Sequence, residues 1–246
     1  MFCDTHCHIL KEYYDEIDKV ILEAKENGID RLVVAADNYD SSLEVLELVK
    51  KYDNLYGNIG LHPENVSEDF DYSIFDKLSK KIVAIGEIGL DYHYGKENRD
   101  KQIEVFRKQL GIAEELNLPV VVHSRDATED TINILKDYKV KGVIHSFSGS
   151  LQTAKIYLNM GFKLGVNGVV TFKNCKLKDV YSKLSPYDIV LETDSPYLTP
   201  HPFRGGQNSP KYVRVIAEYM ANLFDISMEE LADITNKNVA DIFDIK

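Results

Sequence analysis

The chain has 246 residues, of which 44% are hydrophobic and 28% charged, and its formal net charge at pH 7 is −11. This length suits one large α/β domain, and the hydrophobic fraction is enough for a sizeable core. The acidic balance excludes a polybasic protein that coats DNA or membranes, because such proteins attract polyanions through an excess of Lys and Arg. It remains compatible with an enzyme that accepts one nucleic-acid end at a metal site.

Three features of the chain favour a cytoplasmic enzyme. No apolar stretch approaches the roughly 18 residues of a membrane span, so no membrane association is expected. The first residues enter a strand without the basic and apolar regions of an export signal. The three cysteines, Cys3, Cys7 and Cys175, are odd in number and give no disulfide framework. Nothing in the sequence indicates an obligate protein partner.

Eight short apolar runs with β character follow one another along the chain, near residues 2–6, 31–36, 55–60, 82–87, 119–123, 142–145, 162–166 and 189–193. Amphipathic stretches lie between them, at residues 13–27, 41–51, 99–116 and 151–160. Eight strands, each followed by a helix, predict a closed TIM (β/α)8 barrel rather than an open sheet. Two or three extra C-terminal helices are expected from Pro210 onward, one with a capped start at 226–230. Residues 1–246 are therefore predicted to form a single domain.

Ionisable side chains stand at the ends of several predicted strands. His6 and His8 are two residues apart on the first strand and therefore face the same side. Because barrel enzymes build their active sites at the C-terminal ends of the strands, such residues are predicted to converge. One histidine at a strand end is more often a hydrogen-bonding residue than a ligand, so the prediction depends on the whole set. The six predicted metal ligands are His6, His8, Glu87, His123, His145 and Asp194.

The residue types predict a hydrolytic metal centre. Glu87 is placed to bridge two cations with one oxygen on each, with His123 and His145 completing the second site. Two ions roughly 3.5–4 Å apart activate a water and stabilise the leaving oxygen of a phosphodiester. Asp194 is the candidate base that takes the proton from that water. Mixed imidazole and carboxylate ligands suit Zn, Mn, Fe or Co, and with weaker imidazole involvement Mg.

Further residues are candidates for holding the substrate. His62 lies in Gly60-Leu61-His62-Pro63, where the proline stiffens a turn that aims the ring over the barrel mouth. Arg204 lies among glycines that allow backbone amides to approach an anion, although a plain surface turn is an equal alternative. Arg125 follows the predicted ligand His123 and can equally pair with a structural carboxylate. Tyr92 is a candidate for stacking on a base or sugar. Lys173 and Lys211 are the other basic candidates for phosphate.

Six motifs, in this order and spacing, carry a resemblance to a known family. They are Asp4-Thr5-His6-Cys7-His8, Gly60-Leu61-His62-Pro63, Gly86-Glu87-Ile88-Gly89-Leu90-Asp91-Tyr92, residues 119–127, His145-Ser146-Phe147-Ser148-Gly149, and Glu192-Thr193-Asp194-Ser195-Pro196-Tyr197-Leu198. Together they resemble the TatD family of metal-dependent deoxyribonucleases, within the amidohydrolase superfamily.

This resemblance implies a TIM barrel with one to three divalent metal ions and hydrolysis of DNA phosphodiester bonds, typically as a 3′-to-5′ exonuclease. It implies the same six metal ligands and a substrate contact at Arg125. His62 is implied near the scissile phosphate, so the candidate catalytic residues are Asp194, Glu87 and His62.

The chain departs from the family pattern at one segment. Family members often carry Arg-Gly-Lys-x-Asn, whereas this chain has Arg204-Gly205-Gly206-Gln207-Asn208, so one cation is missing from the predicted phosphate rim. With the acidic net charge, this favours DNA ends or short single-stranded fragments over long DNA. A metal-dependent ester or amide hydrolase, such as an aminoacyl-tRNA deacylase, is the alternative. A non-catalytic structural metal is disfavoured, because structural sites rarely draw on five separate strand ends.

Overall fold

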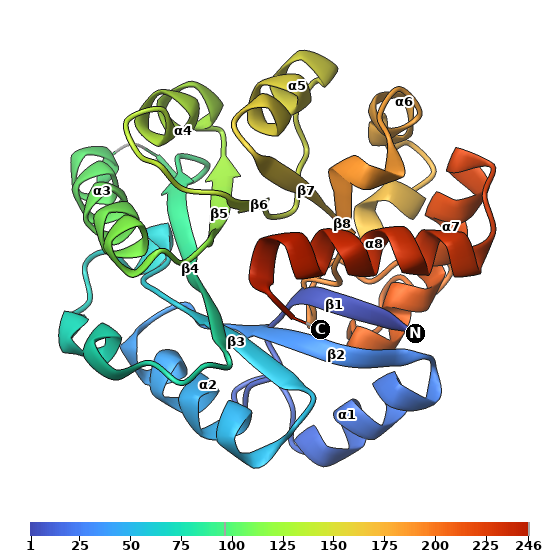
Figure 1. Ribbon diagram of the computed structural model, residues 1–246, viewed down its shortest axis with the longest axis horizontal. Helices are drawn as coiled ribbons and strands as arrows, with labels where there is room; N and C mark the ends of the chain where they lie inside the picture. The colour runs from blue at the N-terminus through green and yellow to red at the C-terminus, as the bar shows by residue number, and fades with distance from the viewer. Residues whose placement is uncertain (96, 246) are drawn as a thin grey trace.

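The computed structural model describes residues 1–95 and 97–245 (Figure 1). Neighbouring strands pair in parallel and in chain order from the first to the eighth. The ring closes where Cys7 bridges to Ser195 and where the Asp194 amide donates to the His6 carbonyl at 2.9 Å. The predicted TIM-like barrel is therefore confirmed. Its strands are β1 (Phe2–Cys7), β2 (Ile29–Ala35), β3 (Leu55–Ile59), β4 (Ile82–Asp91), β5 (Val120–Arg125), β6 (Gly142–Ile144), β7 (Phe162–Val166) and β8 (Ile189–Leu191).

The outer ring is helical, with one exception to the expected pattern. After β3 the described chain forms two short 3₁₀ turns, at Pro63–Asn65 and Tyr72–Lys77, instead of an α-helix. Aromatic rings fill the helix position, because Phe70, Tyr72 and Phe75 pack against one another with centroids 5.0–6.3 Å apart. The helices are α1 (Ile17–Glu26), α2 (Tyr39–Lys51), α3 (Arg99–Leu116), α4 (Thr128–Leu135), α5 (Leu151–Asn159), α6 (Leu177–Tyr181), α7 (Val213–Phe224) and α8 (Met228–Phe243).

The last helix closes one end of the barrel. Figure 1 shows α8 crossing in front of the strands. Its residues Val239, Ile242 and Phe243 join a buried cluster with inward-facing side chains near the strand starts, such as Val33 and Val121. Filled interiors of this kind are typical of TIM barrels. This plug fills the barrel interior at the N-terminal ends of the strands, so the ligand candidates at the C-terminal ends lie at the other end of the barrel.

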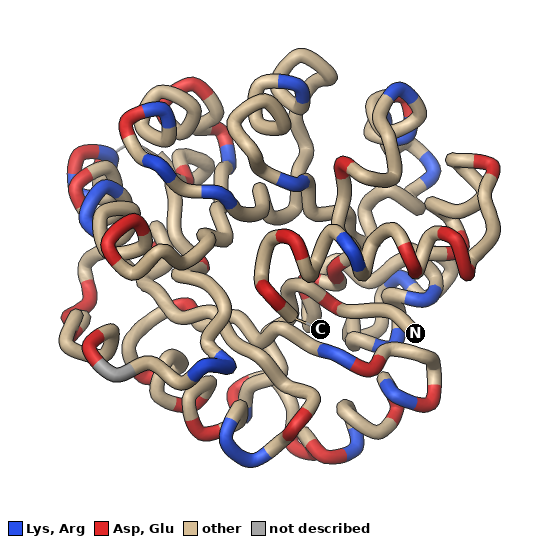
Figure 2. The backbone as a smooth tube through the Cα atoms, in the orientation of Figure 1, with Lys and Arg blue, Asp and Glu red and all other residues tan. Residues whose placement is uncertain are grey.

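Charged residues lie mostly on the outer helices and loops, whereas the strands carry few of them (Figure 2). In the part of the chain that the structure describes, no helix is long and apolar enough to cross a membrane. Buried charge is thus concentrated at the strand ends that were predicted to form the site.

Candidate metal centre

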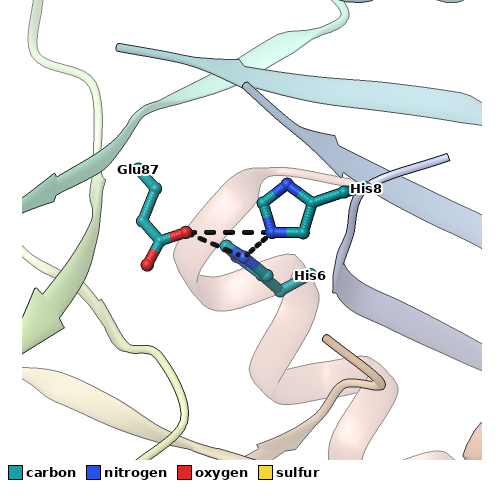
Figure 3. A group of neighbouring side chains, drawn as sticks. All are labelled: His6, His8 and Glu87. Carbon is teal, nitrogen blue, oxygen red and sulfur yellow. Dashed lines mark hydrogen bonds and ion pairs between the residues drawn. The ribbon is translucent and has the colours of Figure 1, made fainter. Parts of the chain in front are cut away.

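Four side chains converge where β1 meets β8 and β4. The Nε2 atoms of His6 and His8 lie 3.1 Å apart, and His6 Nε2 lies 3.1 Å from Glu87 Oε2 (Figure 3). Asp194 Oδ1 lies 3.8 Å from His6 Nε2 and 3.5 Å from His8 Nε2. Donors at 2.0–2.1 Å from one tetrahedral Zn²⁺ stand about 3.3 Å from each other. The group therefore fits a divalent cation without rearrangement of the chain.

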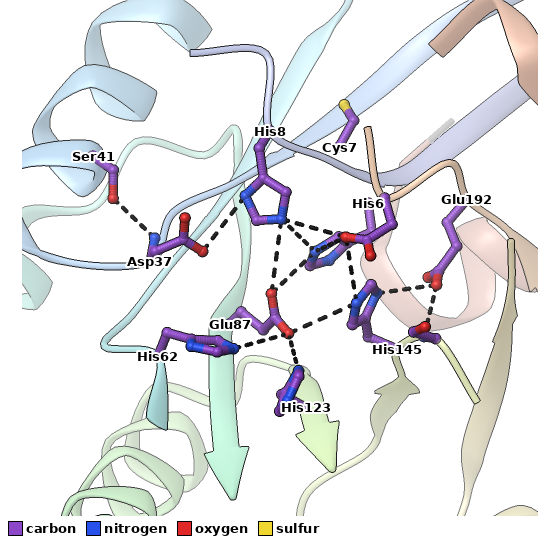
Figure 4. Close-up of polar contacts among 12 residues, drawn as sticks. His6, Cys7, His8, Asp37, Ser41, His62, Glu87, His123, His145 and Glu192 are labelled. Atoms are coloured by element: carbon purple, nitrogen blue, oxygen red, sulfur yellow. Dashed lines mark hydrogen bonds and ion pairs between the residues drawn. The ribbon is translucent and has the colours of Figure 1, made fainter. Parts of the chain in front are cut away.

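The other oxygen of Glu87 faces a second group of imidazoles. Oε1 lies 2.8 Å from His123 Nδ1, 3.6 Å from His62 Nε2 and 3.8 Å from His145 Nε2 (Figure 4). The ring of His145 also stacks on His6 with centroids 3.7 Å apart, so it lies between the two groups. Glu87 is thus placed as a bridging carboxylate would be. Sequence analysis named His62 as a catalytic candidate near the scissile phosphate and did not count it among the ligands, whereas the structure places it beside this second group.

A carboxylate faces the outer nitrogen of three of these histidines. Such partners fix the orientation of a ligating imidazole and increase its basicity. Sequence analysis did not identify Asp37 and Asp91 as partners of the ligand candidates. Their common signal is position, since each stands at or just after a strand end. The pairs are His8 Nδ1 with Asp37 Oδ1 at 3.5 Å, His123 Nε2 with Asp91 Oδ2 at 2.9 Å and His145 Nδ1 with Glu192 Oε1 at 3.0 Å.

Comparison with known proteins supports this geometry. A family model described as "TatD related DNase" matches residues 3–244. The chain belongs to the TatD family. It is 42% identical to the uncharacterized metal-dependent hydrolase YabD of Bacillus subtilis over 100% of both chains. It is 38% identical to the uncharacterized metal-dependent hydrolase YcfH of Escherichia coli K12, over 98% of this chain and 95% of that one.

A solved relative confirms the architecture. The crystal structure of YjjV, a TatD homologue from Escherichia coli K12, superposes with a TM-score of 0.95 at 30% identity, covering 100% of this chain and 98% of that one. The protein is accordingly a metal-dependent hydrolase of the TatD family, within the amidohydrolase superfamily, and its buried histidine and carboxylate clusters suit divalent metals.

The pKa values of two ligand candidates of this TatD site, Glu87 and Asp194, are lowered by neighbouring imidazoles. Burial raises the pKa of Glu87, but the imidazoles of His145 and His6 lower it by more than burial raises it. The pKa of Glu87 therefore lies well below the ordinary value. The pKa of Asp194 is lowered in the same way, chiefly by His145 against the effect of burial. Burial lowers the pKa of His8, and its carboxylate neighbours more than reverse this effect, raising that pKa to about 9. The lowered pKa values of the carboxyls and the raised pKa of His8 have one cause, since buried carboxylates stabilise positive charge beside them, whether a proton on an imidazole or a cation.

A buried carboxylate ties the first strand to the last. Asp4 is fully buried, and it accepts hydrogen bonds from the Thr193 amide at 2.9 Å and from the Thr193 hydroxyl at 2.6 Å. Asp4 precedes His6 by two residues, and Thr193 directly precedes Asp194, which adopts the left-handed region with φ of 57°. This contact therefore sets the position of two ligand candidates relative to each other. Sequence analysis quoted Asp4 in a motif without giving it this role.

A cavity of about 450 Å³ opens above the ligands. Four of the histidines line it, together with two tyrosines, two asparagines and six acidic residues. Among these described residues there is no lysine or arginine. The mouth of the site is therefore more acidic than a general DNA-binding surface would be.

The three predicted substrate-binding residues lie outside that cavity lining. Arg125 is exposed and lines a neighbouring cavity of about 200 Å³, which shares His145 with the main site. The guanidinium of Arg204 lies 3.9 Å from the centroid of the Phe172 ring. Tyr92 is 7% exposed, and its hydroxyl donates to Asp130 at 2.8 Å. Of the three, Arg125 is the residue whose cavity is also lined by a ligand candidate, His145.

Proposed function

We propose that this TatD-family protein is a divalent-metal-dependent phosphodiesterase that removes nucleotides from the 3′ ends of DNA. The observation that carries the proposal is Glu87, whose two oxygens face two separate groups of imidazole donors. Two cations held close together suit an in-line displacement at a phosphodiester. The family model, described as a TatD related DNase, supports DNA as the substrate.

One to three divalent ions fit the donor set. Mixed imidazole and carboxylate ligation suits Zn, Mn, Fe or Co, and less readily Mg. His6, His8, Glu87 and Asp194 would hold the first ion, and Glu87 with His123 and His145 the second. When bound, divalent cations lower the pKa of water and polarise a phosphoryl oxygen.

The chain itself supplies a general base and a hydrogen-bond donor. The Asp194 side chain is 15% exposed at the cavity, and its lowered pKa keeps the carboxylate ready to take the proton of the attacking water. The Glu64 amide donates to His62 Nδ1 at 3.3 Å. With Nδ1 accepting, the neutral ring carries its proton on Nε2 and can donate to an oxygen of the scissile phosphate.

The expected substrates are DNA ends and short single-stranded fragments. The acidic lining repels a continuous polyanion, whereas cations held by the ligand candidates would neutralise the charge of one terminal phosphodiester. The exposed cations Arg125 and Arg204 lie outside the cavity, where they can attract the adjacent backbone.

A second candidate is an ester or amide hydrolase, such as an aminoacyl-tRNA deacylase. The acidic lining favours it, because Glu12, Glu64 and Glu68 would attract the ammonium group of an aminoacyl ester. The same metal chemistry activates water against an acyl carbon.

The decisive experiment compares the two substrate classes. Metal-stripped protein is reloaded with Zn, Mn or Mg and incubated with a 5′-labelled single-stranded oligonucleotide and, separately, with an aminoacylated tRNA. Metal-dependent stepwise shortening from the 3′ end, absent in Asp194→Asn, supports the exonuclease. Release of the amino acid from the tRNA, with the DNA left intact, would contradict the exonuclease proposal and support the deacylase.

A further inference from the structure

The cavity above the metal ligands must recognise its substrate without lysine or arginine. Its described lining holds six acidic residues and no basic one apart from histidines that belong to the ligand groups. The two asparagines are already engaged, since Asn38 accepts from the Ser41 amide at 3.0 Å and Asn65 donates to the Asp37 carbonyl at 3.1 Å. Among the uncharged residues of the lining, the rings of Tyr13 and Tyr197 are left to contact a substrate.

These two rings stand together beside a metal ligand. Their centroids are 5.9 Å apart with an interplanar angle of 70°, and each lies 6.4 Å from the centroid of the His8 ring. Tyr197 is 51% exposed although it lines the active-site cavity. A large aromatic side chain left open at a metal site offers a face for a flat ligand group.

One segment fixes the backbone of both tyrosines. The Gln207 side chain donates to the Tyr13 carbonyl at 2.7 Å, and the buried Asn208 amide group donates to the carbonyl of Tyr197. The Tyr14 hydroxyl completes the arrangement by donating to the Asn208 carbonyl at 2.7 Å. Gln207 and Asn208, which directly follow the departure from the family pattern at Gly206, therefore fix the main chain of both tyrosines. Such pre-organisation reduces the entropy lost on binding.

We propose that Tyr13 and Tyr197 form a stacking platform for the terminal nucleobase of the substrate, an inference that rests on the proposed phosphodiesterase function. Every nucleobase has a π face, so this platform tolerates any base and reads the presence of a base rather than its identity. It also gives affinity that does not depend on phosphate contacts, which the acidic lining cannot provide. The enzyme would thus bind the end of a chain through its last base.

The test uses two oligonucleotides that differ only in the last residue, which is either a normal 3′ nucleotide or an abasic one. The platform predicts that wild-type kcat/KM falls at least about fivefold on the abasic end. Tyr197→Ala should lose a similar factor on the normal end, mainly through KM, and little on the abasic end. Tyr197→Phe should keep the discrimination. Tyr187→Ala is the matched control, because Tyr187 is 50% exposed and precedes β8 at the opposite end of the barrel.

Equilibrium binding separates the platform from the reaction. The same pair of oligonucleotides, with a phosphorothioate at the last linkage, is titrated by fluorescence anisotropy against metal-loaded wild type and Tyr197→Ala. Tighter binding of the normal end by wild type alone supports the platform, even if no DNA is cleaved and the phosphodiesterase proposal fails. Equal binding of both ends by wild type, or an equal loss on both ends in Tyr197→Ala, would overturn the platform.

Discussion

A single methyl group added behind the candidate metal centre should weaken metal binding without contacting any of the ligand candidates. A Cβ added at Gly165 on β7 would lie 2.3 Å from Glu192 Oε2 and 2.6 Å from its Cδ. Glu192 is fully buried, accepts from the Ser146 amide at 2.7 Å and orients His145 at 3.0 Å. The carboxylate therefore cannot move aside without breaking these contacts.

The magnitude of the Gly165→Ala effect follows from those contacts. Overpacking costs about 1–3 kcal/mol, and loss of a hydrogen bond to a charged group costs about 1.5–3 kcal/mol. The resulting destabilisation of about 2.5–6 kcal/mol corresponds to a Tm lowered by roughly 5–24 °C for a chain of this size. Loss of an outer partner of a ligating histidine lowers metal affinity or activity about 10–100-fold.

The assay combines thermal unfolding with metal affinity measured against a competing chelator. Gly111→Ala is the matched control, since nothing lies within 4 Å of an added Cβ there and the residue is inside α3. That control should raise stability by about 0.5–1 kcal/mol and leave metal affinity unchanged. Wild-type metal affinity and Tm in Gly165→Ala would refute the argument that Glu192 positions His145.

Other predictions concern single contacts. Glu87→Ala should retain the fold in circular dichroism but lose most activity and bound metal; an active variant would exclude a bridging role. A divalent ion at 100 times its Kd should stabilise the protein by about 2.7 kcal/mol, and a Tm independent of metal would contradict the site. Arg204→Ala should raise KM more than it lowers kcat in oligonucleotide hydrolysis, and an unchanged KM would contradict a role of Arg204 in substrate binding. The Lys211 hydrogen bond at 2.7 Å lowers the pKa of Glu23, so this pair should add about 0.2–1 kcal/mol above the unfolded pKa of the carboxyl. That contribution should disappear as pH falls through the folded pKa, and urea unfolding of Glu23→Gln and wild type at about pH 7 and about pH 3 measures it.

The strands and the ligand candidates could be predicted from the amino-acid sequence, because both depend on local patterns. Apolar β-runs and alternation of side chains place His6 and His8 on one face whatever the remainder of the chain does. The missing helix after β3 was not predictable in this way, since aromatic packing among Phe70, Tyr72 and Phe75 replaces it. Tertiary contacts override a repeating pattern when they bury enough apolar surface.

The carboxylates that face the outer nitrogens of the histidines could not be identified before the chain was folded. The chain has 40 acidic residues, and a position at or just after a strand end does not by itself assign Asp37 to His8 or Asp91 to His123. Closure of the barrel brings Asp4 against Thr193, 189 positions away, and places Tyr13 beside Tyr197. Strand alternation is a property of neighbouring residues, whereas these contacts depend on where eight strands meet in a ring. The sequence therefore gives the kind of chemistry, and ring closure fixes which side chains orient the ligands and which surround the substrate.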